Sequence, residues 1–167
     1  IEDVMPSPQA LFEAQGIPAW SKPAERTRQL AEQAIEIYKE RSRPIGVFVE
    51  LRKDEFTPVF RGDGRNEDES PVGPIYDSSE HLALFAVTLG ENICSEISQR
   101  FSFHDYALGS MLDATASAGT EMAADALELC YKGYLQNDID WNSQNGFLRF
   151  SPGYCGWHLT GQRQLFE

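Results

Sequence analysis

The sequence has 167 residues, of which 41% are hydrophobic and 24% are charged, a composition typical of a globular protein. Lys and Arg total 14 and Asp and Glu total 26, so the formal net charge is −12. A surface this acidic repels nucleic-acid phosphates and anionic lipid headgroups, so we expect no binding to nucleic acid or to membranes. No apolar run approaches the roughly 20 residues of a membrane-spanning helix.

The first half of the chain predicts two helices and a strand. A short helix fits residues Gln9–Gln15, because Gly16 follows them. Residues Ala24–Arg41 place apolar side chains at positions i, i+4, i+7 and i+8, which predicts an amphipathic helix. Pro44 ends this helix, and the β-branched run Ile45–Leu51 that follows predicts a strand.

Residues 61–135 predict a loop, a buried strand and two more helices. Residues 61–75 are rich in Gly, Pro and acidic residues, so we expect an exposed loop there. The continuous apolar run Leu82–Thr88 predicts a buried strand. A helix begins near Glu91, and a long helix follows and ends near Leu135. Its small residues at 114–119 permit close approach of a partner helix or of a bulky ligand.

The C-terminal part begins with a turn-rich segment, residues Asn137–Gly146, followed by a strand-like piece at Phe147–Phe150. Residues Leu159–Phe166 predict the start of a helix. These elements together predict an α+β fold for residues 1–167, with one domain in which long helices flank a twisted, mainly antiparallel sheet.

The three cysteines, Cys94, Cys130 and Cys155, are far apart, and an odd, sparse set does not form a disulfide framework. They favour a reducing compartment and hence the cytoplasm. The sequence contains neither CxxC nor HExxH, so no dedicated zinc site is indicated. We expect Cys94 and Cys130 in the core. Cys155 is either a small buried apolar residue or a functional thiol.

The segment Arg149–Trp157, RFSPGYCGW, carries the most information about a site. Pro152 and Gly153 break regular structure and expose backbone amides and carbonyls. The planar guanidinium of Arg149 suits a carboxylate, and the ring of Tyr154 suits a cation or a flat group. Two interpretations follow from these residues: a site for a zwitterionic, sulfonium-bearing ligand, or a tight turn with a surface arginine and packed aromatic residues.

Four segments resemble, in the same order, motifs of the reactivation domain of cobalamin-dependent methionine synthase. Phe85-Ala-Val-Thr88-x-Gly90 resembles the motif FAVT-x-G, and His104-Asp105-Tyr106 resembles H-D-x-Y shortened by one residue. The stretch from Met122-Ala-Ala-Asp125-x-Leu127 through Tyr134-Leu135 resembles L-A-D-x-L…Y-L. Arg149-x-x-Pro152-Gly153-Tyr154 resembles R-x-x-P-G-Y. The resemblance covers about residues 82–167. The end of the chain is most similar to compact, stand-alone relatives.

The resemblance implies a module that binds S-adenosylmethionine beside a corrinoid and supports the reductive remethylation of cobalamin (vitamin B12) in methionine biosynthesis. The chain has no visible homocysteine or folate module, so it resembles an accessory domain of a methyltransferase, and whether it turns over substrate stays open. The implied partners are a corrinoid-binding protein or domain that carries the cobalamin, and an electron donor such as a flavoprotein. The chemistry needs no general base, and no catalytic residue is assigned.

The resemblance also implies which residues bind S-adenosylmethionine: Arg149, Ser151, Pro152, Gly153 and Tyr154. A family acid on the long helix contacts the amino end of the ligand.

In this sequence Leu129 occupies the position of that acid, and Glu128, one residue away, is the candidate ligand-binding acid in its place. A shift of one residue turns a helical side chain by about 100°. The residues after Tyr154 also depart from the family pattern, because Cys155-Gly-Trp-His158 replaces a stretch with Pro and His. His158 either faces the corrinoid or is a packed, hydrogen-bonded residue.

These departures favour a second hypothesis, a non-enzymatic domain of the same fold that binds a corrinoid protein or another small molecule. A third hypothesis is an interaction domain without a ligand, which the acidic loop would suit. The sequence leaves the physiological partner and the oligomeric state open.

Overall fold

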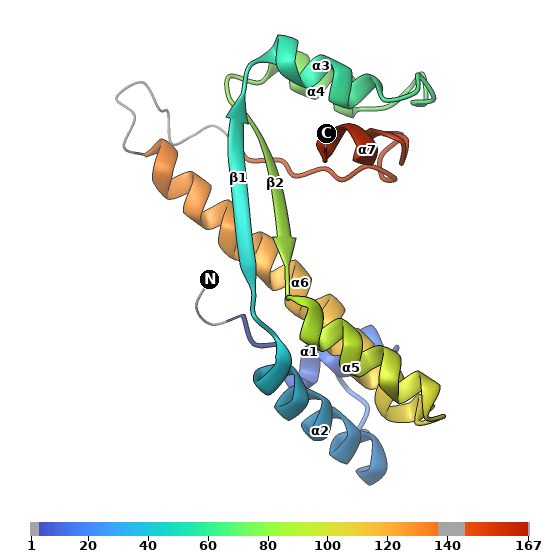
Figure 1. Cartoon of the computed structure of the whole chain (residues 1–167). Coiled ribbons are helices and arrows are strands. Elements are labelled where there is room, and N and C mark those ends of the chain that lie inside the picture. Colours follow the sequence, from blue (N-terminus) through green and yellow to red (C-terminus); the bar gives the residue numbers. More distant parts are fainter. Residues whose placement is uncertain (1–3, 137–145, 167) are drawn as a thin grey trace. The chain divides into compact units, whose positions relative to one another are not determined.

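The computed structural model describes residues 4–136 and 146–166 (Figure 1). The elements are, in chain order, α1 (Pro8–Ala14), α2 (Glu25–Arg41), β1 (Ile45–Leu51), α3 (Lys53–Arg61), α4 (Val72–Ser78), β2 (Leu82–Thr88), α5 (Glu91–Ser102), α6 (Tyr106–Leu135) and α7 (Gly161–Leu165). Within this part of the chain, β1 and β2 form a two-stranded antiparallel sheet. The predicted α+β class is confirmed.

The chain divides into two compact units, which we describe separately. Unit 1 comprises Ile1–Val47 and Ala86–Leu135, and unit 2 comprises Phe48–Phe85 and Gln136–Glu167. The boundaries fall inside both strands. Most of the predicted turn-rich segment after Leu135 lies outside the described residues.

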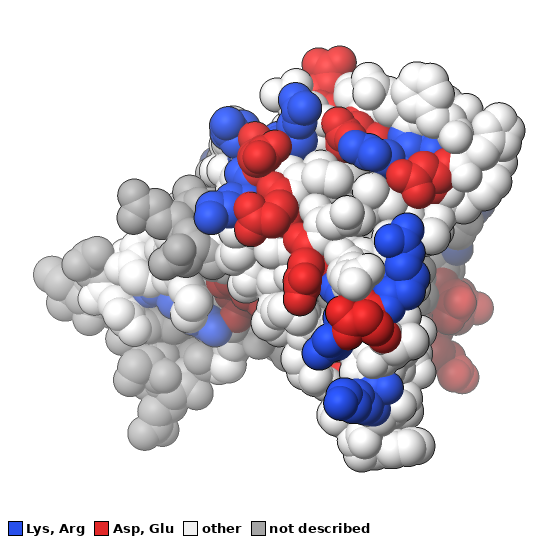
Figure 2. Space-filling model, turned by 90° about the horizontal axis from the view of Figure 1, so that it is seen from below, with Lys and Arg blue, Asp and Glu red and all other residues white. Residues whose placement is uncertain are grey.

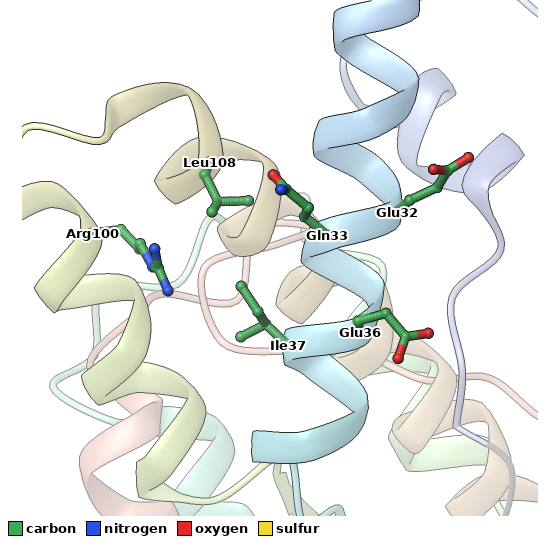
Figure 3. A pocket seen from close by; sticks show the side chains of 6 residues that line it. All are labelled: Glu32, Gln33, Glu36, Ile37, Arg100 and Leu108. Atoms are coloured by element: carbon green, nitrogen blue, oxygen red, sulfur yellow. The ribbon is translucent and has the colours of Figure 1, made fainter.

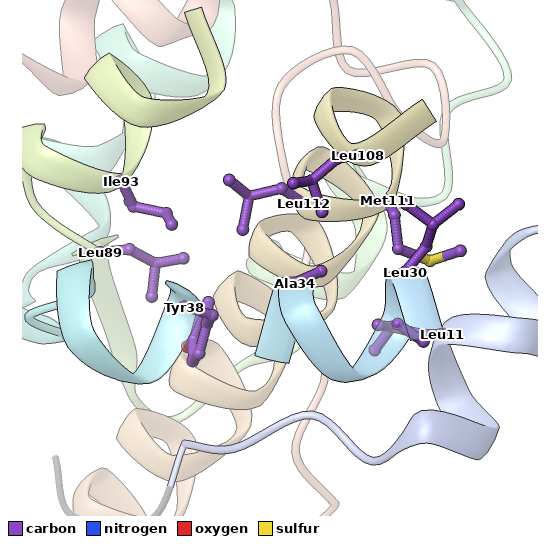
Figure 4. Packing of buried hydrophobic residues seen from close by; sticks show 10 residues of the cluster. Leu11, Leu30, Ala34, Tyr38, Leu89, Ile93, Leu108, Met111 and Leu112 are labelled. Atoms are coloured by element: carbon purple, nitrogen blue, oxygen red, sulfur yellow. The ribbon is translucent and has the colours of Figure 1, made fainter. Parts of the chain in front are cut away.

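Unit 1 is a helical unit in which α1, α2 and α5 pack against the long helix α6. Its core is built from apolar side chains of all four helices (Figure 4), and Leu11, Ala34 and Leu112 have no exposed surface. The predicted apolar face of α2 is confirmed, since Leu30, Ala34 and Tyr38 are buried. The 3.6-residue period of the sequence therefore places the correct face of this helix in the core.

The small-residue stretch of α6 allows one helix to approach another closely. A Cβ atom at Gly119 would lie 2.6 Å from Cε2 and Cζ of Tyr38 on α2. Tyr38 is 1% exposed, and its hydroxyl donates a hydrogen bond to the carbonyl of Val4 at 3.0 Å. At Gly119 the small residue lets α2 approach α6 closely, which is the packing of a partner helix that the sequence analysis expected as one of two possibilities.

The helix α5 ends in a left-handed residue that is not glycine. His104 has φ 63°, and its N–H donates to the carbonyl of Phe101 at 3.1 Å. The N–H of Asp105 donates to the carbonyl of Arg100 at 2.9 Å, which completes a Schellman motif. His104 therefore caps the end of α5.

Unit 2 is built around an aromatic cluster that belongs to α3, α4 and the C-terminal segment. Phe56, Val59, Val72 and Trp157 form its buried centre. The helix α3 contributes Phe56 and Val59 at i and i+3, so that one of its faces is buried. It packs against α4 and against α7, which lies beside it (Figure 1).

Three expectations about elements are wrong. The expected exposed loop at 61–75 is partly packed, because Val72 of the unpredicted helix α4 is 2% exposed. Residues 147–150 are irregular and not a strand, although Phe150 packs against the core of unit 2. The strand β2 is half-buried and not buried, since a sheet of two strands has no inner strand.

The cysteines are also placed differently from the expectation. Cys94 and Cys130 are exposed and not in the core, and Cys155 is exposed too. The helices α5 and α6 turn other residues inward, such as Ile93 and Leu127, which are 1% and 6% exposed. All three cysteines are free thiols.

Candidate functional site

The segment with the R-x-x-P-G-Y signature forms a turn in unit 2 with hydrogen bonds between its own backbone groups. We call residues 151–158 the signature turn. The N–H of Gly153 donates to the carbonyl of Trp157 at 2.6 Å, and the N–H of Trp157 donates to the carbonyl of Tyr154 at 3.0 Å. Three of its residues have positive φ: Gly153 at 97°, Cys155 at 53° and Gly156 at 73°. The turn thus has a defined backbone that glycine makes possible at two positions.

Trp157 anchors the end of the signature turn in the core of unit 2. Its side chain is 4% exposed, and its ring meets Phe56 edge-on, with centroids 5.8 Å apart and planes at 77°. The centroid of Phe60 lies 6.2 Å away. Among the described residues, the buried indole Nε1 finds no hydrogen-bond partner. Trp157 is therefore a packed aromatic residue, as the second interpretation of this segment expected.

A second segment of unit 2, residues 62–71, forms hydrogen bonds with the signature turn. We call this segment the support loop. Ser70 Oγ donates to the carbonyl of Cys155 at 2.8 Å, and the N–H of Glu67 donates to the carbonyl of Gly156 at 3.0 Å. The N–H of His158 donates to Asn66 Oδ1 at 2.9 Å. The sequence analysis missed these residues, because hydrogen bonds between distant segments leave no local pattern.

The N-terminal half of the signature turn faces solvent. Tyr154 is 70% exposed, Ser151 and Gly153 are exposed, and Pro152 is half-buried. Arg149, which precedes the turn, is also half-buried. The five predicted contact residues of this segment are therefore all exposed or half-buried in unit 2.

Glu128, the remaining predicted contact residue, belongs to α6 and therefore to unit 1. It is half-buried, and its Oε1 accepts a hydrogen bond from Lys132 Nζ at 2.6 Å, an i,i+4 ion pair. Leu129, at the position of the family acid, is 66% exposed.

His158 makes local hydrogen bonds. Its Nδ1 lies 3.1 Å from Thr160 Oγ1, and the residue is half-buried. These contacts agree with the interpretation of His158 as a packed, hydrogen-bonded residue. Cys155, in contrast, exposes its thiol beside Tyr154, so the expectation of a buried apolar cysteine is wrong.

Unit 1 contains a shallow groove of about 410 Å³ between α2, α5 and α6 (Figure 3). Gln33, Ile37, Arg100 and Leu108 point into it, whereas Glu32 and Glu36 point away from it. Arg100 is already engaged, since its guanidinium lies 2.6 Å from Glu96 and 3.6 Å from Asp105. The sequence analysis did not predict this groove, and no residue of the signature turn lines it.

Charged side chains of both signs lie on the face shown in Figure 2. In Figure 2, acidic and basic side chains are interspersed over the visible surface. Within residues 4–136 and 146–166, no helix combines the length and apolar character needed to cross a bilayer. In the same residues, no three His, Cys, Asp or Glu side chains form a group that would hold a metal ion.

No protein-family model and no curated protein sequence matches the chain. The family and its activity therefore stand as a proposal.

Proposed function

We propose that Arg149 and the signature turn bind S-adenosylmethionine, and that the chain is a corrinoid-reactivation module of the methionine synthase type. The observation that carries this proposal is the exposed, hydrogen-bonded turn with an accessible phenol at Tyr154. The order of the four sequence motifs supplies the identity of the ligand.

The residues fit the chemistry of this ligand. S-adenosylmethionine combines an amino-acid zwitterion with a sulfonium cation. The guanidinium of Arg149 would bind the carboxylate through paired N–H donors, and the π face of Tyr154 would lie against the sulfonium or the adenine. The backbone of Ser151, Pro152 and Gly153 would line the same ligand. A net charge of −12 also favours a ligand with positive charge over an anionic one.

Glu128 is the acid that we propose for the amino end of the ligand. Its carboxylate is already paired with Lys132. We therefore expect Glu128→Gln to weaken binding by only about 0.5 kcal/mol, roughly twofold.

The corrinoid of a partner protein would supply the cobalt nucleophile that takes the methyl group, and S-adenosylhomocysteine would leave. This chain contributes the position of the methyl donor and the electrostatics around it. An electron donor such as a flavoprotein would reduce the cobalt beforehand. Three exposed free thiols agree with a reducing compartment, so we place this chemistry in the cytoplasm.

Calorimetric titration with S-adenosylmethionine tests the proposal. We expect Arg149→Ala to weaken binding at least tenfold, about 1.4 kcal/mol, and Arg149→Lys to restore only part of it, because an ammonium lacks the planar fork. Arg163→Ala, which removes another arginine of unit 2, is the matched control and should bind like the unaltered chain. No heat at millimolar ligand, or an equal loss in both alanine variants, would contradict the assignment.

A second candidate function is a non-enzymatic domain that binds a corrinoid protein or another small molecule. The exposed Leu129 in place of an acid favours it, because an apolar side chain cannot pair with an amino group. The absorbance spectrum of cobalamin with and without the protein separates the candidates: direct binding changes the spectrum even when S-adenosylmethionine gives no heat.

A further inference from the structure

We infer that the support loop fixes the signature turn in its ligand-binding shape, with Ser70 and Asn66 as the positioning residues. The inference deepens the proposed function and rests on it, since it concerns the same site. Neither residue lies in the part of the sequence that resembles the family.

Ser70 acts on the most constrained residue of the turn. Cys155 adopts φ 53°, a left-handed conformation that costs a side-chain-bearing residue roughly 1–2 kcal/mol. Such a conformation persists only where its surroundings hold it. Ser70 is 8% exposed, and its hydroxyl donates to the carbonyl of Cys155 itself at 2.8 Å. This hydrogen bond orients the peptide between Cys155 and Gly156.

The next residue of the turn is held by shape as well as by a hydrogen bond. A Cβ atom at Gly156 would lie 2.9 Å from Ser70 Cβ and 3.1 Å from Glu67 Cβ. The support loop therefore touches the backbone of the turn directly. The N–H of Glu67, at 3.0 Å, satisfies the carbonyl of Gly156 in the same contact.

Asn66 holds the end of the turn and ties it to α3. Its Oδ1 accepts the N–H of His158 at 2.9 Å, while its Nδ2 donates to the carbonyl of Phe60 at 2.6 Å. Phe60 packs against Trp157. The Asn66 side chain therefore bonds to the backbone of one residue of the aromatic cluster, Phe60, and to the backbone of His158, which follows Trp157 in the chain. Asn66 and Ser70 thus hold residues 155–158 by hydrogen bonds, while Tyr154, the residue before them, stays exposed.

The test compares Ser70→Ala with Ser78→Ala. Both substitutions remove one hydroxyl donor to a backbone carbonyl in unit 2, but Ser78 bonds to Ile75 at 3.0 Å, outside the turn. Amide hydrogen exchange is measured at Gly153 and Trp157, whose N–H groups close the turn. In Ser70→Ala we expect these amides to exchange roughly fivefold faster, the factor for one lost hydrogen bond, and in Ser78→Ala we expect no change.

Affinity for S-adenosylmethionine is measured on the same variants. We expect it to fall at least threefold in Ser70→Ala and in Asn66→Ala, to stay unchanged in Ser78→Ala, and to recover in Ser70→Thr, which keeps the hydroxyl. These factors are on the order of one lost hydrogen bond. A merely structural role for Ser70 would lower stability without this recovery or this local exchange.

The outcomes separate the inference from the proposed function. If the turn amides exchange faster in Ser70→Ala but affinity is unchanged, or if exchange does not change at all, the positioning role is overturned. If the unaltered chain binds no S-adenosylmethionine, the proposed function fails, and the exchange comparison alone then decides whether the support loop holds the turn.

Discussion

Gly156 gives a prediction that isolates the contact between the signature turn and the support loop. Gly156 and Gly64 both belong to unit 2 and have nearly the same positive φ, 73° and 74°. They differ in surroundings: a Cβ atom at Gly64 would meet nothing within 4 Å, whereas one at Gly156 would lie 2.9 Å from Ser70 Cβ. Substituting alanine at both positions therefore separates the cost of the backbone conformation from the cost of the contact.

The expected magnitudes follow from these two terms. A left-handed alanine costs about 1–2 kcal/mol, and replacing glycine recovers roughly 0.5–1 kcal/mol of backbone entropy. Gly64→Ala should therefore lower the free energy of unfolding by about 1 kcal/mol. Gly156→Ala carries the same loss and an overpacking cost of about 1–3 kcal/mol, because the backbone of the turn must move away from Ser70. The expected total is about 2–4 kcal/mol.

Urea denaturation followed by tryptophan fluorescence measures both variants in a Trp20→Phe, Trp141→Phe background, so that the signal comes from the buried Trp157 of unit 2. The reasoning is refuted if the two variants lose equal stability, because the contact with Ser70 would then contribute nothing. A variant that folds but loses its turn-closing hydrogen bonds should also bind S-adenosylmethionine at least tenfold more weakly, about 1.4 kcal/mol.

Three further predictions concern unit 1. Gly119→Ala should destabilise the chain by about 1–2 kcal/mol, because the added methyl group meets Tyr38, whereas Gly133→Ala on the same helix meets nothing within 4 Å and should be neutral or stabilising by about 0.5 kcal/mol; thermal melts of both variants decide. Burial raises the pKa of Tyr38 above its ordinary value of 10.0, so the stability linked to this proton is complete below pH 10 and is lost as pH rises through the raised pKa. Unfolding curves between about pH 8 and pH 12 should show this loss in the unaltered chain but less of it in Tyr38→Phe, and parallel curves would contradict the linkage. His104→Gly should stabilise the chain by about 0.5 kcal/mol, because glycine relieves the left-handed strain at the end of α5, and a lower melting temperature would refute this.

The elements that the sequence predicts well are those with a strong local pattern, either a continuous apolar run or a helical period. The strands β1 and β2 have the predicted bounds, Ile45–Leu51 and Leu82–Thr88, because continuous apolar and β-branched runs favour strands. The helix α2 has the predicted apolar face, since its pattern repeats over several turns. The helix α3 was missed because it is short and contains Pro58, which normally argues against a helix interior.

One part of the candidate site could be predicted from the sequence and the other part could not. The exposed turn around Pro152 and Gly153 follows from local sequence, because Pro and Gly punctuate the backbone. The support loop does not, since Ser70 and Cys155 are 85 residues apart and Asn66 and His158 are 92 apart. Hydrogen bonds at such separation depend on the tertiary fold, which a single sequence does not specify by pattern.

The exposure of the cysteines shows the limit of helical periodicity. Cys94 lies next to the buried Ile93 on α5. An apolar face that is assumed to contain both residues therefore places Cys94 wrongly in the core. Neighbouring residues on a helix point about 100° apart, so which one faces the core depends on where the packing helices lie.

Amide chemical shifts during a titration with S-adenosylmethionine test most directly whether the signature turn binds this ligand. We expect the largest shifts at Gly153, Tyr154 and Cys155, and we expect Arg149→Ala to need at least tenfold more ligand for the same shifts while Arg163→Ala leaves the titration unchanged. Shifts confined to residues of unit 1, or unchanged spectra at millimolar ligand, would contradict the proposed site.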